Sequence, residues 1–83
     1  MEAMAYSEAR ERIEAHYGDP EPHRRFSDQW TPRGFYERAA REFARFADAK
    51  RADGGQDEFG IVRNEEMARA CRVLADAMHE EQG

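Results

Sequence analysis

The side chains best able to perform chemistry are one cysteine and three histidines in a chain of 83 residues. His16, His23, Cys71 and His79 stand at irregular distances, and no two of them have the i, i+4 spacing that lets one helix bind a metal. Cys71 and His79 lie eight positions apart, about 12 Å along a straight helix, so one helix cannot bring them into contact. The sequence therefore predicts no metal site and no cysteine nucleophile.

The carboxylates offer a second kind of chemistry, either calcium binding or acid–base catalysis. Residues Asp53–Asp57 (DGGQD) resemble the start of a calcium-binding loop, but Glu58 replaces the glycine of the sixth position. Asn64 stands where the bidentate glutamate is required, so we exclude calcium. The remaining carboxylates alternate with arginines, a pattern typical of solvated ion pairs. We expect no cofactor and no enzymatic activity.

The apolar composition is weak for a folded chain of this length. Hydrophobic residues make up 40% of the chain, but fourteen of them are alanine. Leu, Ile, Val and Phe together number ten of 83 residues, about 12%, and charged residues reach 37%. A domain this short buries only about 60% of the surface of its unfolded chain. We expect residues 1–83 to form one small domain whose core is undersized, so that a protein partner or a second copy supplies further burial.

Charge is distributed unevenly along the chain. The formal net charge is −5, with about −4 over residues 1–23, +4 over 24–52 and −5 over 53–83. The first residues carry neither the basic nor the apolar part of a signal peptide, and the longest apolar run is two or three residues. We expect a cytoplasmic protein that does not bind membranes.

Apolar periodicity and helix-end signals predict an all-α fold, a small three-helix bundle. The first helix covers residues 4–17 and ends at Gly18, and the second covers 32–52, opened by Thr31 as cap and Pro32 in the first turn. The third covers 64–80, with Asn64 as its cap. A long connection, 18–31, joins the first two helices. Residues 59–63 (FGIVR) favour a short strand that could pair across a homodimer.

A basic face on the second helix supports one functional hypothesis. Arg38, Arg41 and Arg45 recur at helical spacing and could lie on nucleic-acid phosphates. Acidic residues share that face, and Glu65 and Glu66 near the start of the third helix would repel phosphate. A small DNA-binding transcriptional regulator is therefore our alternative rather than our first hypothesis, and we expect direct nucleic-acid binding less than protein binding.

Protein binding is the hypothesis that the sequence favours, on two sets of residues. The first set combines aromatic and arginine side chains, the types that dominate interface hot spots: Arg24, Arg25, Phe26, Trp30 and Arg33. Whether these rings form an interface or the core is left open. The second set is acidic and could engage a basic groove of a nucleic-acid-binding complex: Glu8, Glu11, Glu14, Asp19, Glu21, Asp57, Glu58, Glu65 and Glu66.

The combination of small size, acidity and lack of motifs resembles many phage-encoded inhibitors, including anti-CRISPR proteins. The resemblance rests on size and charge alone and assigns a role to no residue. It implies a non-enzymatic inhibitor that occludes a basic nucleic-acid-binding surface of a host complex. The sequence identifies neither the partner nor the oligomeric state.

Overall fold

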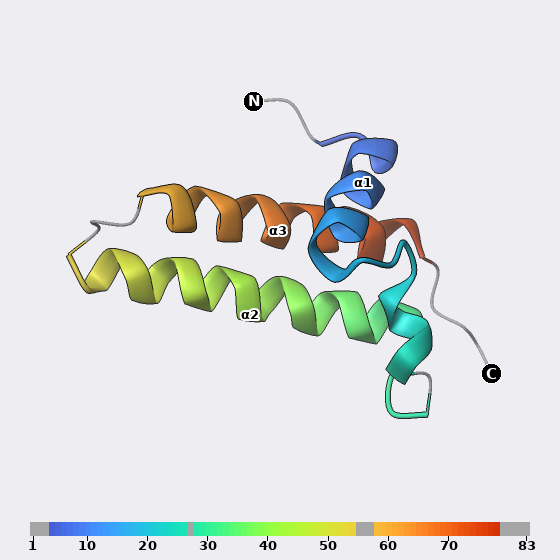
Figure 1. Cartoon of the computed structure of the whole chain (residues 1–83). Coiled ribbons are helices and arrows are strands. Elements are labelled where there is room, and N and C mark those ends of the chain that lie inside the picture. Colours follow the sequence, from blue (N-terminus) through green and yellow to red (C-terminus); the bar gives the residue numbers. More distant parts are fainter. Residues whose placement is uncertain (1–3, 27, 55–57, 79–83) are drawn as a thin grey trace.

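Two long antiparallel helices, α2 (Pro32–Ala52) and α3 (Glu58–Ala77), lie side by side along the molecule, as Figure 1 shows. A shorter helix, α1 (Tyr6–Tyr17), crosses α3 steeply near its C-terminal half, and a 3-10 helix, η1 (Pro22–Phe26), packs at the same end. The computed structural model describes residues 4–26, 28–54 and 58–78. The described residues contain three α-helices and no strand, which confirms the predicted all-α bundle.

The second helix has the bounds that the sequence predicts. The Thr31 hydroxyl oxygen accepts a hydrogen bond of 3.0 Å from the Gly34 backbone N–H, and Pro32 occupies the first helical position, where no N–H is needed. α1 ends, also as predicted, at Gly18, whose φ of 72° is a conformation that suits glycine. α1 begins at Tyr6, two residues later than expected.

The third helix begins six residues earlier than predicted, and the strand expected at 59–63 is wrong. Residues 59–63 form the first turns of α3, which starts at Glu58, and Ile61 is buried there. Asn64 is an interior residue rather than a cap, and its Nδ2 donates to the Gly60 carbonyl oxygen at 2.9 Å. Packing along α2 outweighs the weak local strand preference of this run, so a strand-paired dimer is excluded.

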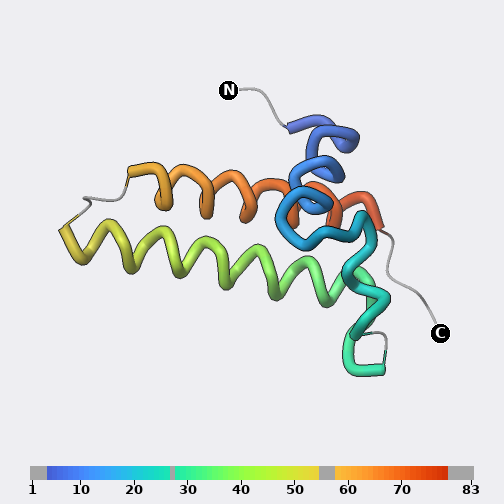
Figure 2. The backbone as a smooth tube through the Cα atoms, viewed as in Figure 1, coloured from blue at the N-terminus to red at the C-terminus, as the bar shows by residue number. Residues whose placement is uncertain are grey.

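The core lies where the three helices meet. It is built of small and aromatic side chains. Alanines from all three helices are almost fully buried, which lets the helices approach closely; the core residues are Ala9, Ile13, Tyr36, Ala40, Phe43, Met67, Ala70, Cys71, Leu74 and Ala75. Helical periodicity in the sequence places Tyr6 on the apolar face of the first helix and Phe46 on that of the second, but both side chains are exposed. α1 is too short to cover the far half of the α2–α3 hairpin (Figure 2).

The long connection between α1 and α2 packs against α2. Pro22 is buried, and the Nδ1 atom of His23 lies 2.9 Å from the hydroxyl oxygen of Tyr36. Phe26 stacks on Phe35 with ring centroids 5.5 Å apart and planes 16° apart. These contacts fix η1 on the first turns of α2.

Among the described residues, no helix combines the length and the apolar character that crossing a bilayer requires.

Candidate functional site

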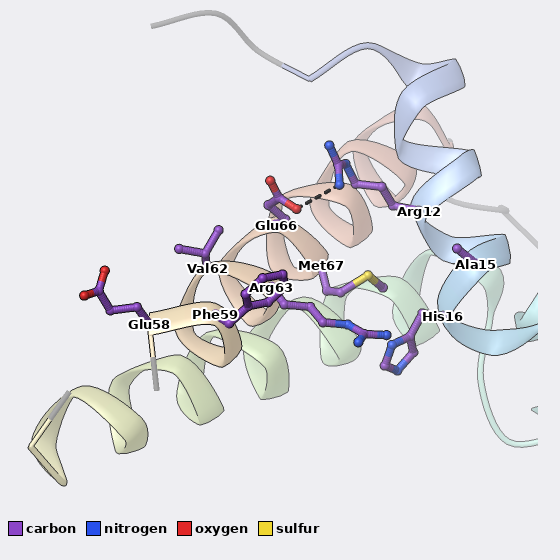
Figure 3. Close-up of a pocket in the computed structure, with 9 residues that line it drawn as sticks. All are labelled: Arg12, Ala15, His16, Glu58, Phe59, Val62, Arg63, Glu66 and Met67. Atoms are coloured by element: carbon purple, nitrogen blue, oxygen red, sulfur yellow. Dashed lines mark hydrogen bonds and ion pairs between the residues drawn. The ribbon is translucent and has the colours of Figure 1, made fainter. Parts of the chain in front are cut away.

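Two apolar grooves flank the last turn of α1. The first, which we name the aromatic groove, has a volume of about 370 Å³ and runs along α2; it is lined by Tyr17, Phe26, Gln29, Trp30, Phe35, Arg38, Ala39, Glu42, Phe43 and Phe46. The second, the α1/α3 groove, has a volume of about 550 Å³ and is shown in Figure 3; it is lined by Arg12, Ala15, His16, Glu58, Phe59, Val62, Arg63, Glu66 and Met67.

The last turn of α1 divides the grooves because its neighbouring side chains point to different sides. His16 lines the α1/α3 groove, and its ring meets Phe43 edge-on at 5.1 Å. Tyr17 lines the aromatic groove and packs near Phe35, with ring centroids 6.2 Å apart. Both grooves therefore depend on the position of α1.

The exposed large apolar side chains gather in these grooves. Phe59 is 86% exposed and Val62 51% exposed in the α1/α3 groove, while Phe46 is 55% and Phe26 41% exposed in the aromatic groove. Tyr6, 46% exposed, is the one large apolar residue in the described part that is exposed but lines neither groove. Exposed apolar side chains clustered in grooves are the signature of a surface that binds another molecule.

The aromatic groove contains two of the five predicted aromatic and arginine anchors, Phe26 and Trp30. The other three, all arginines, are held in ion pairs beside it: Arg24 with Glu21 at 2.8 Å, Arg25 with Asp19 at 3.4 Å and Arg33 with Glu37 at 2.9 Å. The structure thus answers the open question for Phe26, which is surface rather than core.

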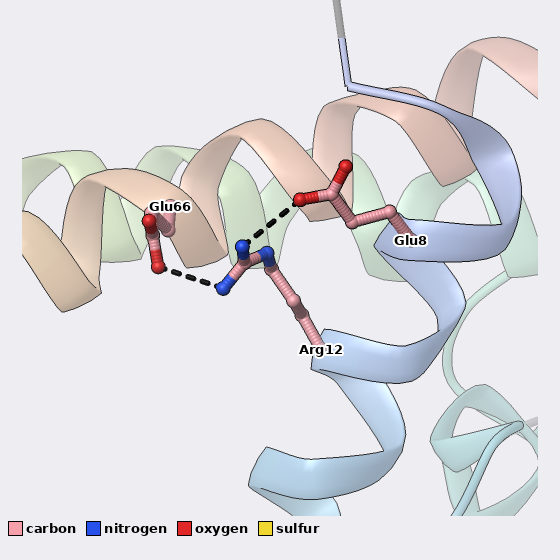
Figure 4. Close-up of polar contacts among 3 residues, drawn as sticks. All are labelled: Glu8, Arg12 and Glu66. Carbon is pink, nitrogen blue, oxygen red and sulfur yellow. Dashed lines mark hydrogen bonds and ion pairs between the residues drawn. The ribbon is translucent and has the colours of Figure 1, made fainter.

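The predicted acidic surface is partly neutralised by ion pairs. Arg12 bridges two of its carboxylates, bonding Glu8 at 2.9 Å on its own helix and Glu66 at 2.8 Å on α3 (Figure 4). Glu65 is paired with Arg51. With the Asp19 and Glu21 pairs above, five of the nine predicted carboxylates are engaged. Glu11, Glu14 and Glu58 have no ion pair among the described residues, and Asp57 lies outside them.

The three arginines of the predicted basic face of α2 have different surroundings. The Arg38 guanidinium lies 4.8 Å from the centre of the Trp30 ring and its Nε bonds Glu42 at 3.0 Å, so Arg38 belongs to the aromatic groove. Arg41 and Arg45 are exposed and form no ion pair within the described part of the chain. Only two of the three arginines are therefore available to an external anion.

Sequence reasoning missed Phe46, Phe59 and Val62 as groove residues. Periodicity placed Phe46 on the inner arc of the second helix, and Phe59 and Val62 were absorbed into the expected strand. Their exposure follows from the short length of α1 and its steep crossing of α3 (Figure 1). A helical pattern does not encode such a crossing, so no local signal could have identified them.

The thiol and the potential metal ligands that the sequence contains can now be placed in the structure. Cys71 is fully buried, and burial raises the pKa of its thiol to about 12. His79 lies outside the described residues. No group of three or more potential metal ligands occurs in the ranges 4–26, 28–54 and 58–78.

Cys71 is expected to resist thiol reagents in the folded protein. The thiolate is the reactive species, and both the raised pKa and the lack of solvent access suppress it. Reaction with a disulfide reagent at pH 8 should be slow in buffer and complete within the mixing time in strong denaturant. A thiol that reacts equally fast in both conditions would show that α3 is not packed as described.

Replacing Arg63 with glutamine is expected to raise the pKa of His16 part of the way to its ordinary value of 6.5. Burial is the larger cause of the lowered His16 pKa, and the nearby positive charge of Arg63 is the second. Nuclear magnetic resonance titration of the imidazole C–H signals measures the midpoint directly. His23 is the internal control, since its lowered pKa arises from burial and from charges other than Arg63. An unchanged His16 midpoint would contradict the placement of Arg63.

Comparison of the chain with protein-family models, with curated proteins and with solved structures found no match.

Proposed function

We propose that this chain is a non-enzymatic protein-binding module that docks a helix of a partner protein in the aromatic groove. The observation that supports the proposal most strongly is the clustering of exposed apolar side chains in grooves lined by helices. Phe46 and Phe26 are exposed members of a groove that Tyr17, Trp30 and Phe35 also line. Helices commonly bind other helices through such grooves, which receive apolar side chains at helical spacing.

The chemistry beside the groove favours an acidic, amphipathic partner helix. Within the lining, the charges of Arg38 and Glu42 neutralise one another. The unpaired charges on the outer face of α2 are positive, Arg41 and Arg45, and Arg45 immediately precedes Phe46. A helix that buries apolar residues in the groove and carries carboxylates along one flank satisfies both features. The carboxylates expected to occlude a basic surface are mostly paired within the chain, so the aromatic groove carries the proposal in their place.

The proposal is tested by affinity capture from a nuclease-treated lysate of the source organism, with two matched bait variants. Phe46→Asp places a charge in the groove, whereas Tyr6→Asp changes an equally exposed aromatic residue outside it. We expect the wild type and Tyr6→Asp to retain the same protein, and Phe46→Asp to bind it at least 30-fold more weakly, the effect of losing a hot-spot residue. Equal retention by all three baits would refute docking in the groove.

Binding of DNA through the basic face of α2 is the second candidate, favoured by the exposure of Arg41 and Arg45 without ion pairs in the described ranges. The net charge of −5 and the engagement of Arg38 count against it. If this candidate is correct, the wild type binds a DNA duplex at low salt and the Arg41→Ala, Arg45→Ala double variant does not. A wild type that fails to bind duplex DNA at low salt would refute DNA binding as the function.

A further inference from the structure

In the described part of the chain, the first half of α3 carries an apolar patch that no other helix covers. Phe59 is 86% exposed and Val62 51% exposed, one turn apart on the same side of the helix. α1 crosses α3 beyond this point, so the patch forms the open end of the α1/α3 groove (Figure 3). Phe59 lies in the first turn of α3, and burying a phenylalanine or valine side chain that is this exposed is worth about 1.5–3 kcal/mol per residue.

Two charges of opposite sign flank this patch. Glu58 lies before Phe59 and Arg63 after Val62, both line the groove, and neither has an ion-pair partner among the described residues. The other two charged residues of the groove are already paired with each other, because Glu66 bonds Arg12 at 2.8 Å. The Arg63 side chain extends across the groove toward His16 (Figure 3). The patch therefore presents one free negative and one free positive charge around an apolar centre.

We propose that this patch is a self-association surface, on which a second copy of the chain docks its own Phe59 and Val62 about a twofold axis. In this arrangement Glu58 of each copy pairs with Arg63 of the other. A twofold interface places the same surface on both copies, so that surface must be complementary to itself. An apolar centre flanked by equal and opposite free charges meets that requirement. The dimer uses a different groove from the proposed partner site and does not depend on it.

A second copy fits the patch better than a partner of single charge. A basic partner would leave Arg63 facing a like charge, and an acidic partner would do the same to Glu58. Burying an unpaired charge costs several kcal/mol, which offsets the gain from covering Phe59 and Val62.

The apolar part of the proposal is tested by sedimentation equilibrium of the full chain from about 10 μM to about 1 mM. We expect the wild type to reach a dimer in this range, and Phe59→Asp to weaken dimerisation at least 30-fold. Because Phe59 is exposed, this variant should keep the helical circular dichroism of the wild type. Tyr6→Asp is the matched control and should dimerise normally. A wild type that remains monomeric throughout, or a dimer indifferent to Phe59→Asp, would overturn the proposal.

The charge pairing is tested by mixing two variants. In Glu58→Arg the new arginine faces Arg63 of the second copy, and in Arg63→Glu the new glutamate faces Glu58 of the second copy, so each variant alone should be at least tenfold weaker as a dimer. In an equimolar mixture, the heterodimer restores both pairs of opposite charge and should recover wild-type association. This recovery is predicted only if Glu58 of each copy pairs with Arg63 of the other. A mixture as weak as its components would refute the pairing.

Discussion

Replacing Tyr36 with alanine should lower the free energy of unfolding by about 3–5 kcal/mol, the range observed for removal of a large buried aromatic ring. Tyr36 is fully buried at the centre of the core. Its ring meets Phe35 edge-on at 5.0 Å and His23 at 5.4 Å, so one side chain joins α2 to the connection that precedes it. A domain of 83 residues has a total stability of about 4–12 kcal/mol. The loss is therefore a large part of the total stability, and the variant should unfold at a markedly lower temperature than the wild type.

Tyr36→Phe is the control that separates ring packing from the hydroxyl. It keeps the ring and removes the hydrogen bond between the hydroxyl and Nδ1 of His23, which should cost about 0.5–1.5 kcal/mol. Urea denaturation monitored by circular dichroism measures both variants. If Tyr36→Phe destabilised the protein as much as Tyr36→Ala, the hydroxyl rather than the ring would hold η1 on α2. If Tyr36→Ala cost less than 1 kcal/mol, the described core would be wrong.

The parts of the fold that sequence predicted are those fixed by local signals. Thr31 and Pro32 define the start of α2 through a cap and a fixed φ angle, and Gly18 ends α1 through its positive φ. The start of α3 was mispredicted because Ile61 and Val62 are β-branched and their local preference is for a strand. The partner that settles their conformation is α2, which is distant in the sequence.

The candidate site, like the fold, could be predicted from the sequence only in part. Phe26 and Trp30 were identified as anchors because aromatic side chains are among the types that dominate interface hot spots. Ion pairs between arginines and neighbouring carboxylates were expected, but the Arg12–Glu66 pair was not, since these two residues meet only when α1 crosses α3. Phe59 and Val62 are exposed because that crossing covers one half of α3 and leaves the other half free. Residue type was readable from the sequence, whereas exposure and charge pairing depend on the docking of α1.

Replacing Ile13 with alanine should release α1 from the rest of the protein and disable both grooves together. Among the residues of α1, Ala9 and Ile13 are the buried ones, and Ile13 is the larger of the two. Truncation of a buried isoleucine costs about 2–5 kcal/mol. The remaining links of α1 include the half-exposed Arg12–Glu66 pair, which contributes about 0.2–1 kcal/mol. Docking of α1 should therefore become marginal while α2 and α3 stay paired.

Native-state hydrogen exchange resolved by residue distinguishes this local release from global unfolding. In Ile13→Ala the amides of α1 should exchange much faster than those of α2 and α3, whereas Ile13→Val should lose only about 0.5–1.5 kcal/mol and keep α1 protected. Equal acceleration in all three helices would show that α1 unfolds only with the whole domain. Because α1 contributes His16 to one groove and Tyr17 to the other, its release should abolish dimerisation and partner capture in the same variant. Retention of either one would show that the corresponding groove does not need its α1 wall.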